Sequence, residues 1–165
     1  MTAPQEPPPI SEKKPSPNRV TLQHSLRTAL AALLSLLAAR LFKLPQVYWA
    51  PITTIIILQS TIGAALDVSV QRIIGTALGA AAGALLVSAF GSAVLIFAAG
   101  VLGMGIICTL LRLSKPAFRF SGITLAIVML NSYNDSIWKV AIHRFTEVSI
   151  GIAVGLLVTA IWPEG

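Results

Sequence analysis

The sequence predicts an all-α membrane protein of six transmembrane helices, arranged as two inverted repeats of three. Its composition is 55% hydrophobic and only 11% charged, and its mean hydropathy is +0.82, which is outside the range of soluble domains. A spanning helix needs about 20 apolar residues, so 165 residues hold about six spans. The apolar runs lack the strict alternation of barrel strands. Lipid is therefore the expected partner of most of the chain.

Residues 1–20 are expected to be a disordered cytoplasmic tail, and residues 21–165 to be the six-helix transmembrane domain. Six of the first seventeen residues are proline, among Lys, Ser and Glu. Such a segment has too little apolar surface to offset the entropy of folding.

The apolar segments predict the six helices at 25–43, 47–66, 72–90, 93–112, 118–133 and 143–162. The short Phe90-Gly91-Ser92 connection makes the third and fourth helices antiparallel neighbours. A cytoplasmic N-terminus places about twice as many basic residues inside as outside, which favours both termini in the cytoplasm. The expected inside set is Lys13, Lys14, Arg19, Arg27, Arg72, Arg112, Lys115 and Arg119, and the outside set is Arg40, Lys43, Lys139 and Arg144.

An ungapped shift that places Arg40 on Arg112 superposes the chain on itself, with repeat halves at about 27–91 and 99–163. The matches include Arg40-Leu41-Phe42-Lys43 with Arg112-Leu113-Ser114-Lys115, the amides Gln59 and Asn131, and Arg72, Gly79 and Gly83 with Arg144, Gly151 and Gly155. Because each half holds an odd number of helices, the second half must enter the membrane upside down. Inverted repeats of this kind are common in secondary transporters.

Glycines recur at a spacing of four in the third and sixth predicted helices. The series is Gly75, Gly79 and Gly83, with Gly151 and Gly155 as its counterpart. Small residues at this spacing let two membrane helices approach closely, so we expect helix packing there. A substrate path lined by exposed backbone is the alternative.

Glu147 lies about one turn inside the sixth predicted helix, and an ionisable residue at such a depth is a candidate for function. Arg144, three positions earlier, lies on the same helix face and can pair with it. The alternative is a protonatable coupling site that includes Glu147, Arg144 and His143 as a relay. The loop residues Asp67 and Asp135 are expected to be solvated.

Five further residues are candidates for a substrate path. Gln59 and Asn131 follow the apolar runs of the second and fifth predicted helices, and their amides can bond a carboxylate or another helix. Arg72, near the cytoplasmic end of its helix, attracts anions or anchors the helix at the interface. Tyr48 and Trp49 are interfacial belt residues or line the path.

No pattern of residues supports an enzyme. The sequence has no nucleophile, base and acid set, no phosphate-binding glycine loop and no metal-ligand spacing, so we expect neither a metal nor a cofactor. The net charge of +6 comes from basic residues at the edges of apolar runs rather than from a basic stripe, which argues against nucleic-acid binding.

Several of these segments together resemble one family of bacterial inner-membrane proteins. They are Tyr48-Trp49-Ala50-Pro51-Ile52-Thr53, Leu58-Gln59, Gln71-Arg72-Ile73-Ile74-Gly75-Thr76 with Gly79, Arg144 with Glu147 and Gly151, and Trp162-Pro163. The chain from about residue 22 to 163 resembles the fusaric acid resistance and aromatic acid exporter family.

This resemblance implies export of aromatic carboxylic acids or similar small amphipathic compounds from the cytoplasm, energised by the proton motive force. Many relatives look longer, with two such blocks or an added cytoplasmic domain. A homo-oligomer or a second transporter subunit is therefore expected as partner. The alternative is a helical membrane subunit that transports nothing and assembles into a larger complex.

Overall fold

A computed structural model describes residues 19–58, 61–131 and 136–162, and this part of the chain is entirely α-helical apart from its connections. The helices are α1 (Arg19–Leu41), α2 (Trp49–Ile57), α3 (Ile62–Phe90), α4 (Val94–Leu110), α5 (Lys115–Leu130) and α6 (Ile137–Ile161). The predicted all-α fold is confirmed for these residues. The proline-rich tail lies outside the described residues.

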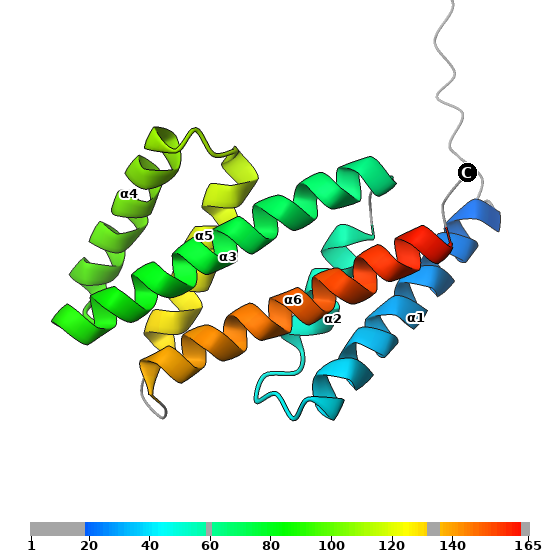
Figure 1. The fold of residues 1–165 in the computed structure, drawn as a ribbon, viewed down its shortest axis with the longest axis horizontal. Helices are drawn as coiled ribbons and strands as arrows, with labels where there is room; N and C mark the ends of the chain where they lie inside the picture. Colours follow the sequence, from blue (N-terminus) through cyan, green and yellow to red (C-terminus); the bar gives the residue numbers. More distant parts are fainter. Residues whose placement is uncertain (1–18, 59–60, 132–135, 163–165) are drawn as a thin grey trace, which may run out of the picture.

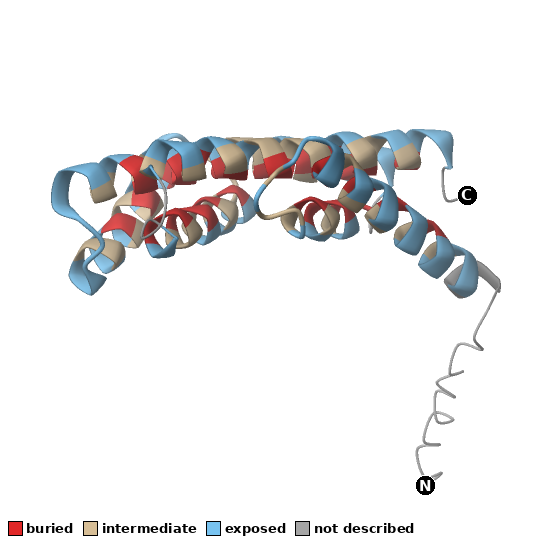
Figure 2. Cartoon of the chain, turned by 90° about the horizontal axis from the view of Figure 1, so that it is seen from below, coloured by how far each residue is buried: buried red, intermediate tan, exposed pale blue. Residues whose placement is uncertain are grey.

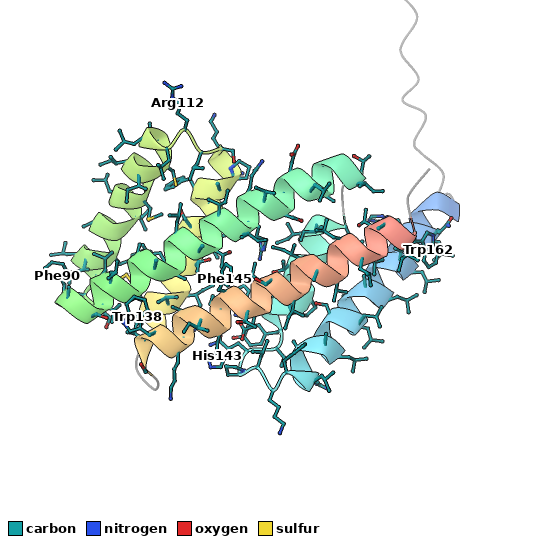
Figure 3. All side chains as sticks on the ribbon, viewed as in Figure 1. Phe90, Arg112, Trp138, His143, Phe145 and Trp162 are labelled. Carbon is teal, nitrogen blue, oxygen red and sulfur yellow. The ribbon has the colours of Figure 1, made fainter. Side chains whose placement is uncertain are left out.

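The helices form two layers (Figures 1 and 2). The long helices α3 and α6 lie side by side and run in opposite directions, so that Phe90 at the end of α3 and Trp138 at the start of α6 are at the same end of the molecule (Figure 3). Behind them, α5 packs on α3 and α2 packs on α6, with α4 and α1 at the two outer edges. The buried residues lie between the two layers (Figure 2).

The second predicted helix is wrong in its bounds. The sequence predicts a span at 47–66, but α2 has only nine residues, so it is about 14 Å long, less than half of a hydrocarbon core of about 30 Å. Helix α2 ends at Ile57, and Thr61 takes the extended backbone of an N-cap and accepts a hydrogen bond from the Ala65 amide. Helix α3 therefore begins at Ile62, well before the predicted start at position 72, and the exposed Asp67 lies in α3 rather than in a loop.

Three of the described helices are long and apolar enough to cross a membrane, namely α1 from Leu22, α3 and α6. Helix α4 is a shorter apolar helix of 17 residues. The outward face of α1 exposes Leu26, Leu30 and Leu34 at 44% to 54% of their surface, which forms an apolar stripe that water would not favour. The described part of the chain thus has the surface of a protein that contacts lipid.

Close backbone contacts hold the two layers together. A Cβ atom on Gly75 would lie 2.5 Å from the Ala117 carbonyl oxygen, and one on Gly79 would overlap the Ser121 carbonyl. In the other half, Gly151 packs directly against the Ala50 carbonyl and Gly155 against Ile57. The glycines lie at the α3–α5 and α2–α6 contacts, which is the packing role that their spacing predicts.

The ends of α1 and α4 have the same local geometry. Lys43 and Arg112 both have φ of 52°. Each donates its amide to the carbonyl three positions earlier, and the next amide bonds the carbonyl five positions earlier, which is the Schellman ending of a helix. Lys43 is therefore the structural counterpart of Arg112, and the ungapped shift that pairs Arg40 with Arg112 does not hold at this turn.

Candidate functional site

Arg72 is buried between three helices in the interior of the fold. It is 5% exposed and is the eleventh residue of the 29-residue helix α3. Its Nε and Nη2 atoms donate to the Thr53 hydroxyl at 3.2 and 3.0 Å, and its guanidinium carbon lies 4.7 Å from the centre of the Phe120 ring. An interfacial anchor would reach water, so this burial contradicts the anchor interpretation and also the placement near a helix end.

Arg144 and Glu147 form a buried ion pair on α6. They are 2% and 1% exposed, and Arg144 Nη1 lies 3.3 Å from Glu147 Oε2. The pairing predicted from their spacing is confirmed, and the pair lies in the interior of the fold rather than on its surface. The Arg144 guanidinium also covers the ring of Trp49 at 3.5 Å from the ring centre, and its buried Nε atom has no hydrogen-bond partner among the described residues.

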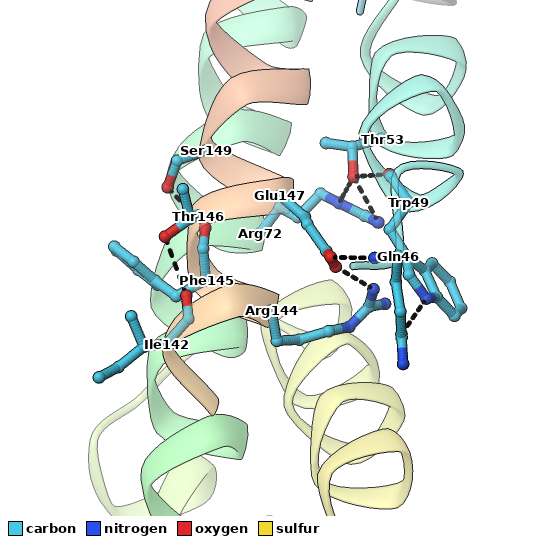
Figure 4. A network of polar contacts seen from close by, with 10 residues as sticks. All are labelled: Gln46, Trp49, Thr53, Arg72, Ile142, Arg144, Phe145, Thr146, Glu147 and Ser149. Carbon is cyan, nitrogen blue, oxygen red and sulfur yellow. Dashed lines mark hydrogen bonds and ion pairs between the residues drawn. The ribbon is translucent and has the colours of Figure 1, made fainter. Parts of the chain in front are cut away.

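The segment before α2 is bonded to this ion pair (Figure 4). The Gln46 amide donates to Glu147 Oε1 at 3.0 Å, and Trp49 Nε1 donates to Gln46 Oε1 at 3.0 Å. Thr53 continues the network, because its hydroxyl donates to the Trp49 carbonyl at 2.9 Å. Arg72 and Arg144 both point toward α2 in this view. The two arginines, Glu147, Gln46, Trp49 and Thr53 are called the arginine cluster below.

A cavity of about 170 Å³ borders the cluster. Its lining is Pro45, Gln46, Asn131, Val140, His143, Arg144 and Glu147. Two amide residues, an imidazole, a guanidinium and a carboxylate therefore meet at one opening, and four of the predicted site residues lie together. The cavity is therefore not purely apolar, and its lining can form hydrogen bonds with a small polar ligand.

The remaining predicted residues are placed differently. Gln59 lies outside the described residues. Tyr48 is 51% exposed and lies against Trp49, with 5.5 Å between the ring centres, whereas Trp49 faces inward to Arg144. Arg72 belongs to the cluster but does not line the cavity. Among the described residues, no group of three His, Cys, Asp or Glu side chains is placed to hold a metal ion.

Sequence reasoning missed Gln46, Thr53 and Phe120. Phe120 could have been found from the sequence. The shift that places Arg72 on Arg144 aligns Phe120 with Tyr48, which is one position before Trp49. In the structure, Arg72 covers Phe120 as Arg144 covers Trp49. The two arginine–aromatic pairs therefore correspond to each other if the alignment of α2 with α5 is changed by one residue from that shift. Gly75 stands at the position of Glu147 in this comparison.

Comparison with known proteins decides the family. The profile of the family described as fusaric acid resistance protein-like matches residues 30–158. That match reaches all six helices and includes both arginines and Glu147. The chain belongs to the fusaric acid resistance protein-like family. The resemblance inferred from the sequence is confirmed.

A curated relative of this family member is the inner membrane protein YeeA of Escherichia coli (strain K12). The two are 30% identical over 146 residues, which is 86% of this chain and 41% of the relative. The chain therefore spans less than half of the length of that protein. No solved structure matches the chain.

Proposed function

We propose that this protein is a membrane transporter, or a subunit of one, that exports aromatic carboxylic acids or similar small organic anions and draws its energy from the proton motive force. Membership of the fusaric acid resistance protein-like family supports the transporter class. The observation that carries the substrate class is the arginine cluster, which buries two guanidinium groups, one of which lines a polar cavity.

The chemistry of the cluster suits an aromatic carboxylate. Buried guanidinium groups bind carboxylates with charge-assisted hydrogen bonds, and buried charges in membrane helices mark transport paths. Trp49 and Phe120, each under an arginine, offer ring faces beside the two cations. An aromatic carboxylate has one charged end and one ring, so its carboxylate can bind a guanidinium while its ring contacts an aromatic side chain.

The architecture that we propose is a pair of inverted three-helix repeats. The support is the equivalence of their neighbours, since α3 packs on α5 as α6 packs on α2, and α4 on α5 as α1 on α2. The antiparallel course of α3 and α6 agrees with it (Figure 1). Two inverted halves around a shared site are the usual basis of alternating access.

The location that we propose is the bacterial inner membrane, with both termini in the cytoplasm. The name of the Escherichia coli relative supports the membrane, and the distribution of basic residues supports the orientation.

The partner stays a prediction, either a second copy or another transporter subunit. The assignment of Glu147 as a proton-coupling group, with His143 as a relay, also stays a prediction.

Uptake into inverted membrane vesicles tests this function. We expect labelled benzoate to accumulate under an imposed proton motive force in vesicles that contain the protein, and not in empty vesicles. Arg119→Gln changes an exposed arginine of α5 and serves as the control that should retain uptake. Equal uptake with and without the protein, over a panel of aromatic acids, would favour a helical assembly subunit that transports nothing.

A further inference from the structure

The arginine cluster contains more positive than negative charge. It holds the side chains of Arg72, Arg144 and Glu147, all at most 5% exposed. Glu147 pairs with Arg144, whereas Arg72 contacts only a hydroxyl group and an aromatic ring. Within the described residues, no carboxylate pairs with Arg72. The cluster therefore has one positive charge without a counter-charge.

Arg72 also has an unused hydrogen-bond donor. Its Nε and Nη2 atoms bond the Thr53 hydroxyl, and its Nη1 atom makes no hydrogen bond with another described residue. The hydroxyl proton of Thr53 is itself used on the Trp49 carbonyl, so its lone pairs are available to Arg72. Thr53 thus holds the guanidinium in place. No atom of Arg72 is among the fully buried side-chain atoms that lack a hydrogen bond in the described part of the chain. A cation in a protein interior without a counter-charge is unfavourable, and an anion that reaches Nη1 supplies that charge.

We propose that one monovalent carboxylate binds as the missing counter-charge of Arg72, and that Glu147 stays ionised on Arg144 while the anion crosses. This inference rests on the proposed function and specifies its driving force. The anion crosses without a proton, so each one carries a net negative charge through the membrane. The membrane potential, rather than the pH difference, then drives its export from a negative interior.

The charge of the cluster argues against Glu147 as the carrier of a transported proton, which is the role predicted for it from the sequence. A neutral Glu147 would leave Arg144 unpaired and would strengthen the attraction for an anion, so the proton and the anion would each favour the binding of the other. Such coupling moves both in the same direction. A proton gradient directed inward would then draw the anion into the cell, which is the opposite of export.

Other ionisable groups stand on α6 and on the elements that pack against it. Those with described side chains are Asp67 and Arg72 on α3, Tyr48 before α2, Lys139, His143 and Arg144 on α6 itself, Lys115 and Arg119 on α5, and His24, Arg27 and Arg40 on α1. His143 lines the cavity with Glu147. A His143→Gln variant therefore separates any pH effect of the imidazole from an effect of the carboxylate.

The first test is uptake of labelled benzoate into proteoliposomes of the full chain, with equal pH on both sides and a potassium diffusion potential. A potential of about 100 mV, positive inside, should support roughly fifty-fold accumulation of a monovalent anion. Accumulation that needs a pH difference and ignores the potential would overturn the proposal. No uptake of any aromatic acid under either gradient would instead overturn the proposed function itself.

The second test changes the charge of the cluster. Glu147→Gln leaves two unpaired guanidinium groups, and we expect the preference between benzoate and the dianion phthalate to move at least tenfold toward phthalate. Arg72→Gln removes the excess charge and should abolish benzoate uptake, whereas Arg72→Lys keeps the charge and should retain part of it. Unchanged benzoate–phthalate preference in Glu147→Gln would overturn the proposal.

Two exposed positions provide matched controls. Asp67→Asn removes a carboxylate from α3 and Arg119→Gln removes a guanidinium from α5, and both side chains are exposed. Neither should alter the preference between the two acids. Size-exclusion chromatography in detergent shows which variants are folded. If Arg72→Gln does not fold, the Glu147→Gln and Arg72→Lys results still decide the proposal.

Discussion

The guanidinium carbon of Arg144 lies 3.5 Å from the centre of the Trp49 ring. The same relationship recurs at a second buried arginine, where Arg72 covers Phe120 at 4.7 Å. Each pair joins one long helix to one short helix across the two layers. The two pairs differ in their other contacts, because Arg144 also pairs with Glu147, whereas Gly75, which the ungapped shift places on Glu147, packs on the Ala117 carbonyl.

The ion pair should behave as a unit in unfolding experiments. Arg144→Gln leaves the Glu147 carboxylate with only the Gln46 amide, and removal of one partner of a buried ion pair lowers stability by about 3 to 5 kcal/mol. The double variant Arg144→Gln/Glu147→Gln leaves no buried charge at this pair and should lose less than Arg144→Gln alone. Titration with SDS in mixed micelles measures the difference. Additive losses would show that the pair is not coupled.

Thr53 should act through Arg72 rather than through the fold. Thr53→Val keeps the shape of the side chain but removes the acceptor of two Arg72 hydrogen bonds. We expect benzoate affinity to fall at least tenfold, because one hydrogen bond to a charged group contributes roughly 1.5 to 3 kcal/mol. Thr53→Ser keeps the hydroxyl group and should retain the affinity. Equal affinities of the Val and Ser variants, measured by equilibrium binding in detergent, would remove Thr53 from the site.

The contact between α3 and α5 should be sensitive to a single methyl group. Gly79→Ala forces a Cβ atom into the Ser121 carbonyl, and overpacking of this kind lowers stability by roughly 1 to 3 kcal/mol. Gly63→Ala, on the same helix, meets no atom within 4 Å. The control should unfold like the wild-type protein in the same SDS titration. A tolerated Gly79→Ala would mean that the two helices are not in backbone contact.

The proposed inverted architecture predicts that the Lys43 and Arg112 turns face opposite sides of the membrane. Phe42 and Leu111 precede the Lys43 and Arg112 turns and are 66% and 58% exposed. In a Cys108→Ala background, Phe42→Cys should react with a membrane-impermeant maleimide from the periplasmic side. Leu111→Cys should react only after the membrane is opened. Labelling of both from one side would exclude inverted repeats.

The sequence was sufficient for features that depend on local spacing. Arg144 and Glu147 are one turn apart on a helix, so their pairing follows from helix geometry, and the glycine contacts follow from the spacing of four. The course of the chain after Ile57 could not be predicted in this way. The apolar residues on both sides of Gln59 read as one continuous span, whereas the chain ends α2 and starts α3 at Ile62.

The contacts between the two arginines and their aromatic rings could not be predicted, because they depend on the exact start and register of the helices. The ungapped shift that places Arg72 on Arg144 pairs Phe120 with Tyr48, while the structure pairs it with Trp49. A slip of one residue rotates a helix position by about 100°, so it assigns the ring to the wrong face. The depth of Arg72 followed from the early start of α3, which moved this residue from a predicted helix end to the interior.

Counterflow in proteoliposomes tests most directly whether the chain transports carboxylates, because it requires no assumption about the driving force. Vesicles loaded with unlabelled benzoate are diluted into labelled benzoate, and the transient accumulation of label is recorded. We predict accumulation with the wild-type protein and with Arg119→Gln, and none with Arg72→Gln or with benzamide as the internal compound. Absence of accumulation with the wild-type protein, or equal accumulation with benzamide, would contradict a transporter of organic anions.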